Sequence, residues 1–365
     1  MKRVAVLANG PGELWGWARP VVKELKRDGH EVDLVLLPCQ FASGAEERIS
    51  SFLEADHVTP PGRFREVLSS SGKRPYDCVL QLGGDLLYGR LLARDGKTPL
   101  FSYSYGPKKG LKACMEVFTA FEMMAGQFGK AVPVSIVGDL VPDALAMDTG
   151  VSPWRGPGLK IAVFPGSRPA IRRKALPYMT EFLAAARSFL PGAQWVVLLF
   201  PFGEARETAQ WEEAGFDVTA AGTGVVLAGT DVALTQPGTN TLEMFHAGVP
   251  SVVALPEDFI AQVPAPVLLA PLFSLPWIGP ALKRRAFRRY IGRKGYLCWP
   301  NRLLGRELYP EVTGSLSVEE LADRFASYAG NPAWRDETRQ ALSGADRGLK
   351  DAARQVKERI LCNLA

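Results

Sequence analysis

The sequence predicts an α/β fold with two doubly wound, Rossmann-like domains that face each other across a cleft, and with helices at the C-terminal end. Three observations predict it. Short apolar and β-branched runs alternate with helical stretches, the alternation restarts after a passage rich in proline and glycine, and a glycine turn follows the first strand of each series. A chain of 365 residues is long enough for two ordinary domains.

The first series defines an N-terminal domain over residues 1–150, and the second a C-terminal domain over residues 159–345. Residues 151–158 are expected to be the interdomain linker, and residues 346–365 a C-terminal helix that packs back on the N-terminal domain. Ser317 and the glutamates after it predict the capped start of a further helix. Strands are expected at 4–8, 32–37, 78–82, 100–103, 161–164, 195–199, 225–227, 232–234 and 252–255, and an early helix at 18–27.

The two glycine turns mark candidate ligand sites, because ligands of such sheets bind at the carboxyl ends of the strands. The turns are Gly10-Pro11-Gly12 and Pro165-Gly166-Ser167-Arg168. A dinucleotide-binding fingerprint does not fit the first turn, since its third glycine would fall at Trp15.

Residues 232–256 are the most informative segment, because they join two apolar strands through a glycine-rich turn and a short helix. The turn at 236–240 brings bare backbone close to a ligand and opens a helix at 241–247, whose unpaired N–H groups and positive dipole end favour phosphate. A carboxylate beside a phosphate site suits a nucleotide that carries both a diphosphate and a sugar diol, so Glu243 is a candidate for binding a ribose hydroxyl. Alternatively, Gly238 only permits a tight turn and Glu243 lies on a solvated helix face.

Composition predicts a soluble globular protein, since 47% of the residues are hydrophobic and the mean hydropathy is +0.00. The first residues lack the apolar core and cleavage site of a signal peptide, which predicts cytoplasmic residence. The five cysteines and three histidines are scattered without metal-ligand spacing. We therefore expect reduced thiols, no metal site, no cofactor and no Cys–His nucleophile.

Residues 259–294 are the candidate for membrane contact. From 259 to 282 the chain has no charged residue and five prolines, which exclude a spanning helix, and from 283 to 294 it has seven basic residues and no acidic one. This composition is typical of a segment that lies in the interface of an anionic bilayer. A solvated helix face is the alternative, whereas nucleic-acid binding is disfavoured because the neighbouring run is too apolar.

Three motifs in the second half resemble those of one family. They are Phe164-Pro-Gly-Ser-Arg168, Pro237-Gly-Thr-Asn-Thr-Leu-Glu243 and Trp299-Pro-Asn-Arg-Leu-Leu-Gly-Arg-Glu-Leu-Tyr-Pro-Glu311. They are similar to segments of the lipid-A-disaccharide synthases, inverting glycosyltransferases of the GT-B fold, and the resemblance spans nearly the whole chain. It implies that these segments bind a uridine diphosphate (UDP) sugar donor, with Arg168 at the diphosphate and Glu243 at the ribose. The other donor-site residues that it implies are Ser167, Gly238, Thr239, Asn240, Thr241, Asn301, Arg306 and Glu307.

In the first half, the segment 81–91 occupies the place of the family's I-D-x-P-D-F-N-x-R-L motif, which implies that Asp85 is the essential aspartate. A carboxylate at a strand end can accept the proton of the acceptor hydroxyl as that hydroxyl attacks the sugar's anomeric carbon. Helix N-termini and Arg168 would then stabilise the leaving diphosphate. Alternatively, Asp85 only caps the helix that follows Gly84.

The chain departs from the family mainly on the acceptor side. Gly12-Glu-Leu-Trp-Gly-Trp17 keeps the glycines and the glutamate of G-E-A-S-G-D but has tryptophans in place of serine and aspartate, and Val137-Gly-Asp-Leu-Val-Pro-Asp143 lacks the histidine of V-G-H-P-x-x-D. After Arg168, Ile171 occupies the place of a family glutamate, and the cations at 172–174 either meet a substrate phosphate or form a solvated helix end. The tryptophans either contact a sugar or acyl chains, or pack at the turn. The acceptor-side candidates are Gly12, Glu13, Trp15, Trp17 and Asp143.

The resemblance implies a peripheral enzyme on the cytoplasmic face of the inner membrane, bound there through residues 259–294. It would move an acylated amino sugar from UDP to a lipid-linked sugar phosphate. Helix ends and basic side chains can stabilise the leaving diphosphate without a metal ion. Two alternatives stay open: a UDP-sugar 2-epimerase, which shares the fold and donor pocket but needs no lipid surface, and a non-catalytic relative that binds nucleotide sugars or lipid.

Overall fold

The computed structural model describes residues 1–38, 44–94, 96–130, 132–199, 201–256 and 295–364, together with the single positions 279, 282, 285, 286 and 289. The candidate membrane segment, 259–294, lies outside the described residues except at those single positions. Within the described part of the chain, no helix is long and apolar enough to cross a membrane.

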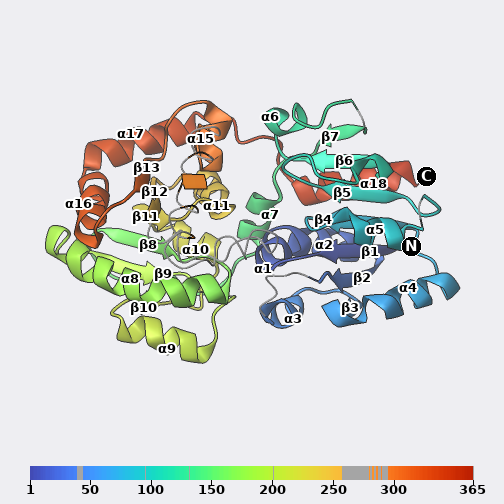
Figure 1. Cartoon of the computed structure of the whole chain (residues 1–365), viewed down its shortest axis with the longest axis horizontal. Helices are drawn as coiled ribbons and strands as arrows, with labels where there is room; N and C mark the ends of the chain where they lie inside the picture. The colour runs from blue at the N-terminus through green and yellow to red at the C-terminus, as the bar shows by residue number, and fades with distance from the viewer. Residues whose placement is uncertain are drawn as a thin grey trace. The chain divides into compact units, whose positions relative to one another are not determined.

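The chain divides into two compact units, each with a parallel sheet and helices around it (Figure 1). The first unit comprises Met1–Met147 and Arg347–Ala365, and the second comprises Asp148–Asp346. The predicted α/β fold with two doubly wound domains is thereby confirmed.

The described strands of the first unit follow the order β3-β2-β1-β4-β5-β6-β7, all parallel. The chain winds outward from β1 on one side and then returns to begin the other side at β4, so the loops after β1 and β4 diverge at a topological switch point. The strands are β1 (Arg3–Ala8), β2 (Glu31–Leu36), β3 (His57–Thr59), β4 (Cys78–Leu82), β5 (Leu100–Tyr103), β6 (Glu116–Thr119) and β7 (Val134–Ile136). The helices are α1 (Pro11–Glu13), α2 (Arg19–Arg27), α3 (Ala45–Ser50), α4 (Phe64–Lys73), α5 (Leu86–Leu92), α6 (Glu122–Ala125), α7 (Leu140–Ala146) and α18 (Ala352–Asn363), with one π-helical turn at Leu14–Ala18 and 3-10 turns at Pro61–Arg63 and Leu111–Ala113.

The described strands of the second unit follow the order β10-β9-β8-β11-β12-β13, also all parallel, and its switch point lies between β8 and β11. The strands are β8 (Lys160–Phe164), β9 (Gln194–Val197), β10 (Asp217–Val218), β11 (Val232–Thr235), β12 (Ser251–Pro256) and β13 (Glu311–Gly314). The helices are α8 (Pro169–Phe189), α9 (Ala205–Glu213), α10 (Thr223–Leu227), α11 (Asn240–Ala247), α15 (Trp299–Leu304), α16 (Val318–Ala329) and α17 (Pro332–Ser343).

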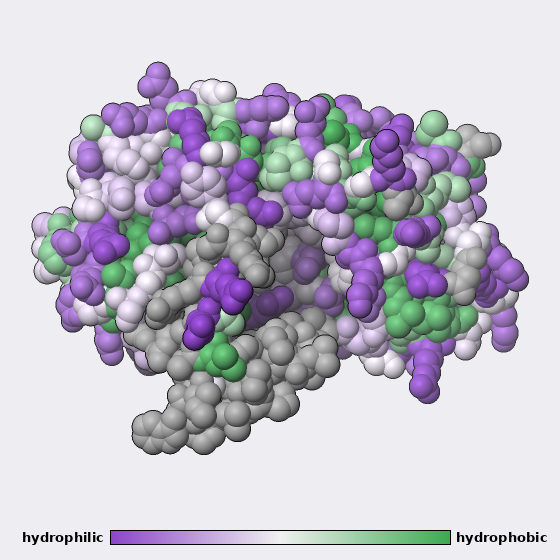
Figure 2. All heavy atoms as spheres, turned by 45° about the horizontal axis from the view of Figure 1, so that its top comes forward, coloured by the Kyte–Doolittle hydropathy of each residue, from purple (hydrophilic) through white to green (hydrophobic). Residues whose placement is uncertain are grey.

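Burial explains why these runs form central strands. Residues 4–8 of β1 and 78–82 of β4 are fully buried, as are residues 161–164 of β8 and 232–235 of β11. Strands covered by helices on both faces are expected to be apolar throughout rather than alternating. On the face drawn in Figure 2, hydrophilic side chains are spread over the described surface, with smaller hydrophobic areas between them.

The expected linker, residues 151–158, forms hydrogen bonds with other parts of the second unit. The Trp154 indole Nε1 donates to the carbonyl of Val226 at 2.8 Å, and the N–H of Arg155 donates to Gln194 Oε1 at 2.8 Å. The carboxylate of Asp148 accepts from the N–H of Gly224 at 2.9 Å. The proline and glycine content therefore marks an irregular backbone that is held by hydrogen bonds over residues 148–158.

Helix α18, drawn in red in Figure 1, belongs to the first unit. The buried ammonium of Lys357 donates to Asp28 Oδ2 at 2.5 Å and to Glu24 Oε2 at 3.5 Å, both from the end of α2. The Asp143 carboxylate accepts from the N–H of Ala353 at 2.7 Å and so caps the helix. These contacts fix the C-terminal segment to α2 and α7.

One predicted strand is wrong and several strands escaped prediction. Residues 225–227 lie in helix α10, where Val226 and Leu227 are buried. A run of three apolar residues fits one buried face of a short helix as well as a strand, so periodicity alone does not separate them. Strands β3, β6, β7, β10 and β13 are two to four residues long, which is too short for a pattern to show. The predicted helices at 18–27 and 241–247 and the capped helix after Ser317 are confirmed, the last with a complete capping box.

Candidate active site

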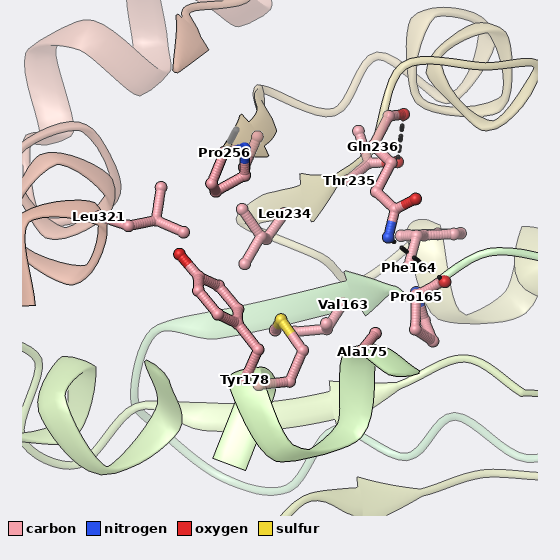
Figure 3. Close-up of a pocket in the computed structure, with 12 residues that line it drawn as sticks. Val163, Phe164, Pro165, Ala175, Tyr178, Leu234, Thr235, Gln236, Pro256 and Leu321 are labelled. Carbon is pink, nitrogen blue, oxygen red and sulfur yellow. Dashed lines mark hydrogen bonds between the residues drawn. The ribbon is translucent and has the colours of Figure 1, made fainter. Parts of the chain in front are cut away.

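The glycine turns of the second unit meet at its switch point. The turn Pro165–Arg168 follows β8 and the turn from Gln236 follows β11, and Thr235 pairs with Phe164 at the ends of these strands. The Gln236 amide Nε2 donates to the carbonyl of Pro165 at 3.5 Å and joins the two turns (Figure 3). The sequence motifs around Arg168 and Glu243 are therefore brought together at the edge where a doubly wound sheet binds its ligands.

Arg168 is half-buried and occupies the N-cap position of α8, a helix of 21 residues. Gly166, two residues earlier, has a φ of +100°, which side chains other than glycine rarely adopt. The turn thus places a guanidinium beside the positive end of a long helix. Both features favour an anionic ligand.

Arg172 has neither of the two roles that its position in the sequence suggested. The side chain is fully buried, so it is neither a solvated helix end nor a contact for a substrate phosphate. It forms a bidentate ion pair with Glu207 of α9 at 2.6 and 2.7 Å and donates to the carbonyls of Ser167 and Gly166 at 2.7 and 3.3 Å. Sequence reasoning missed this support of the turn because Glu207 lies 35 residues away along the chain.

The second turn leads into α11 with exposed backbone at its start. Gly238 and Thr239 are exposed and Asn240 is half-buried. The N–H groups of Thr241 and Leu242 already donate to the carbonyls of Gly238 and Thr239, at 3.2 and 2.9 Å. The exposed backbone from Gly238 to Asn240, at the positive end of the helix dipole, is therefore the part that faces a ligand. Glu243, half-buried and one turn further on, lies where the sequence placed the ribose contact.

Two of the predicted donor-site residues are buried and form structural hydrogen bonds beside the turn 236–240. The hydroxyl of Thr241, fully buried, donates to the carbonyl of Gly238 at 2.7 Å and accepts from the N–H of Trp299 at 3.3 Å. Asn301, also fully buried, donates to Tyr309 O and Glu311 Oε1 and accepts from the N–H groups of Leu308 and Tyr309, at 2.8 to 3.0 Å. The motif from Trp299 to Glu311 is thus a closed hydrogen-bonded structure that packs against α11.

Arg306 and Glu307 lie on the exposed turn between α15 and β13. Behind the strand ends is an apolar cavity of about 40 Å³. Its lining includes Leu234 of β11, Tyr178 of α8 and Leu321 of α16 (Figure 3). The cavity adjoins the turns at Pro165 and Gln236.

The switch point of the first unit carries carboxylates. Ala8 and Leu82 pair at the ends of β1 and β4, and the following loops hold Glu13 and Asp85. A Cβ atom on Gly83 would lie 3.1 Å from Cγ and 3.3 Å from Oε1 of Glu13, so the two loops approach closely here. The φ of +78° at Gly83 also favours glycine. Asp85 is exposed, and its Oδ1 accepts from the N–H of Leu87 at 3.0 Å, so it caps α5 while its carboxylate faces solvent.

A buried glutamine holds the loop that carries Asp85. Gln81 is fully buried on β4, its Nε2 donates to the carbonyls of Gly83 and Asp85 at 2.9 and 2.8 Å, and its Oε1 accepts from Gly89 at 3.0 Å. The position of Asp85 is therefore fixed from both sides. The sequence motif contains Gln81, but only the structure shows what its amide contacts.

Lys108, which sequence reasoning missed, belongs to the same site. It follows β5 and is half-buried. Burial lowers the pKa of its ammonium, while Cys114, Glu13 and Asp85 act on that pKa in the opposite direction. Lys108 therefore lies within electrostatic reach of both candidate carboxylates.

Trp15 and Trp17 are each 8% exposed. Trp17 donates from Nε1 to the Tyr105 hydroxyl at 3.3 Å, and that hydroxyl donates to Asp139 at 2.6 Å. The Trp15 ring lies 3.6 Å from the Arg19 guanidinium and edge-on to Phe52. Both tryptophans therefore pack beside the turn that bears Gly12 and Glu13, and the carboxylate of Asp143 is used to cap α18.

Among the described residues, one group of three potential metal ligands lies close together: Glu31, Asp33 and His57. Glu31 is paired with Arg3 and Arg74, and Asp33 with Arg3 and the Tyr76 hydroxyl. The two carboxylates thus take part in ion pairs on β2, away from the glycine turns.

The chain is similar in structure to proteins of the GT-B fold. It resembles MurG from Acinetobacter baumannii (15% identity, TM-score 0.57, covering 99% of this chain and 100% of that one). It also resembles CalG4, the calicheamicin glycosyltransferase (17%, 0.59, 100% and 99%), and a putative UDP-N-acetylglucosamine 2-epimerase from Listeria monocytogenes (12%, 0.62, 99% and 94%). No protein-family model and no curated protein matches the sequence. The likeness establishes a two-domain GT-B fold.

Proposed function

We propose that this protein is an inverting glycosyltransferase that transfers an acylated amino sugar from a UDP donor to a lipid-linked sugar phosphate, as the lipid-A-disaccharide synthases do. The observation that carries the proposal is the convergence of the motifs with Arg168, Glu243 and Asn301 on one switch point of a GT-B fold. The second unit would bind the donor. Arg168, the backbone of the turn 238–240 and the positive dipole ends of α8 and α11 would hold the diphosphate, and Glu243 the ribose.

The first unit would supply the base. Asp85 accepts the proton of the acceptor hydroxyl while the oxygen attacks the anomeric carbon and the bond from that carbon to the diphosphate breaks, releasing UDP. The exposed carboxylate, fixed by Gln81 and within electrostatic reach of Lys108, suits this role. Leu87 and Leu91, 50% and 43% exposed on the helix that Asp85 caps, offer an apolar strip suited to an acylated acceptor.

The test is turnover of the purified protein with UDP-2,3-diacylglucosamine and 2,3-diacylglucosamine 1-phosphate, followed as release of UDP. We expect release that requires both substrates and persists in the presence of a chelator. Binding of UDP without release under any condition would support the non-catalytic alternative. Turnover that a chelator abolishes and magnesium restores would contradict metal independence.

An epimerase is the second candidate, because the similar structures include the putative UDP-N-acetylglucosamine 2-epimerase from Listeria monocytogenes. Incubation with UDP-N-acetylglucosamine in deuterated water separates the two functions. Deuterium at C2 of the recovered sugar nucleotide would support the epimerase, and its absence beside acceptor-dependent UDP release supports the transferase.

Membrane association through residues 259–294 is a separate part of the proposal. We expect the full chain to sediment with vesicles that contain anionic lipid and to stay in solution with vesicles of neutral lipid, because the basic residues at 283–294 attract an anionic surface. Equal binding to both vesicle types, or to neither, would contradict it.

A further inference from the structure

The guanidinium of Arg172 has five N–H groups, and it forms five hydrogen bonds, each to a different oxygen atom. Nε and Nη2 bind the two carboxylate oxygens of Glu207, Nη1 binds the carbonyls of Ser167 and Gly166, and Nη2 also binds the carbonyl of Phe202 at 2.9 Å. The side chain is 0% exposed. A buried guanidinium is costly unless its charge is paired and its donors are satisfied, and here both conditions are met.

The direction of these bonds sets the direction of the turn's other polar groups. In a trans peptide the C=O and the following N–H point to opposite sides. When Arg172 holds the carbonyls of Gly166 and Ser167 toward itself, the N–H groups of Ser167 and Arg168 point away from it. Successive backbone N–H groups aimed in one direction form an anion-binding nest.

We propose that Arg172 is a positioning residue that shapes the turn 165–168 into a backbone nest for the donor's diphosphate. This inference rests on the proposed function. The residue contacts no ligand and acts through two peptide groups, with Glu207 neutralising its charge.

The experiment must separate positioning from stability, because removing Arg172 alone leaves the Glu207 carboxylate, which is 12% exposed, without this ion pair. We would compare Arg172→Met with the double variant Arg172→Met/Glu207→Met, measuring both the melting temperature and the dissociation constants of UDP and of inorganic pyrophosphate. The single variant should melt well below the wild type. The double variant should recover much of the melting temperature, while its affinity for both probes stays weaker by on the order of tenfold, because the two carbonyls remain unheld.

Two further variants complete the design. Arg173→Met, on the exposed neighbour, should leave both affinities unchanged. Arg172→Lys keeps the charge opposite Glu207 but offers donors from one atom only, so it should also bind the probes on the order of tenfold more weakly. If the double variant does not fold, Arg172→Lys decides the question.

The outcomes distinguish the two levels of the proposal. A wild type that binds neither UDP nor pyrophosphate would overturn the proposed function and this inference together. A wild type that binds both probes, beside folded double and lysine variants that bind them equally well, would overturn the inference alone.

Discussion

The two switch points of this protein have the same architecture and opposite chemistry. In the first unit the loops after β1 and β4 carry Glu13 and Asp85, whereas in the second unit the loops after β8 and β11 carry Arg168 and the starts of α8 and α11. The parallel sheet determines where a ligand binds, and the residues of the loops determine what binds there. This contrast agrees with our proposal, in which the first unit transfers the proton and the second binds the diphosphate.

The supports behind the two switch points follow one principle. A fully buried polar side chain holds the carbonyls of each critical turn: Gln81 in the first unit and Arg172 in the second. The neutral amide supports the turn that bears a carboxylate, and the cation supports the turn expected to hold an anion. Buried polar groups of this kind fix a unique local geometry only while every partner is present.

The largest effect is expected at Asp85. Asp85→Asn should reduce kcat by about 10²- to 10⁴-fold, because it removes a general base. The amide oxygen of the asparagine can still accept from the N–H of Leu87, so the free energy of unfolding should stay unchanged. Asp85→Ala should in addition lower the free energy of unfolding by about 1 kcal/mol, because the helix cap is lost. Kinetics and urea denaturation measure the two effects. An asparagine variant with wild-type turnover would assign Asp85 to capping alone.

Asn301 tests whether the buried hydrogen bonds of the motif 299–311 stabilise the second unit. Asn301→Leu removes four hydrogen bonds in a buried site and should lower the free energy of unfolding by about 3 kcal/mol. Arg306→Ala, in the same motif but exposed, should change it by less than about 0.5 kcal/mol. Urea denaturation of both variants is the measurement. Equal stabilities would show that the buried network contributes nothing to the fold.

Arg168 tests whether the second switch point binds the diphosphate. Arg168→Ala should raise the dissociation constant of UDP by about 10- to 100-fold, the effect of one charge-assisted hydrogen bond. Arg173→Ala is the matched control, since Arg173 is exposed near the start of the same helix. Isothermal titration measures both. Similar losses in the two variants would point to general electrostatic attraction instead of a defined contact.

Asp143 should give the smallest effect and concerns the packing of α18 on the first unit. Burial raises the pKa of its carboxyl group above the ordinary value. Between these two pKa values the folded protein binds more protons than the unfolded chain, so stability falls as the pH rises through the folded-state pKa. Asp143→Asn keeps an acceptor for the N–H of Ala353 and should flatten the dependence of the melting temperature on pH above about pH 4, the ordinary pKa of an aspartate. An unchanged slope in the variant would assign the pH dependence to other groups.

Much of this protein was readable from its sequence. The apolar runs at 4–8, 78–82, 161–164 and 232–234 predicted the central strands, because a strand covered on both faces must be apolar throughout. The glycine turns and the capping box that begins at Ser317 are local sequence signals, and the structure has each of them at the predicted residues. The run 225–227 misled, because three apolar residues do not distinguish a strand from one face of a helix.

The sequence by itself determined the fold class and the glycine turns, because periodicity, glycine and capping act over a few neighbouring residues. Only the tertiary structure decided which polar residues of the motifs face the candidate site and which form structural hydrogen bonds beneath it. Asn301, Thr241 and Asp143 carry structural hydrogen bonds, and Arg172 meets Glu207 across 35 residues. The physical reason is that burial and hydrogen-bond partners depend on contacts between distant segments, and a linear motif does not encode which face of a turn its side chains occupy.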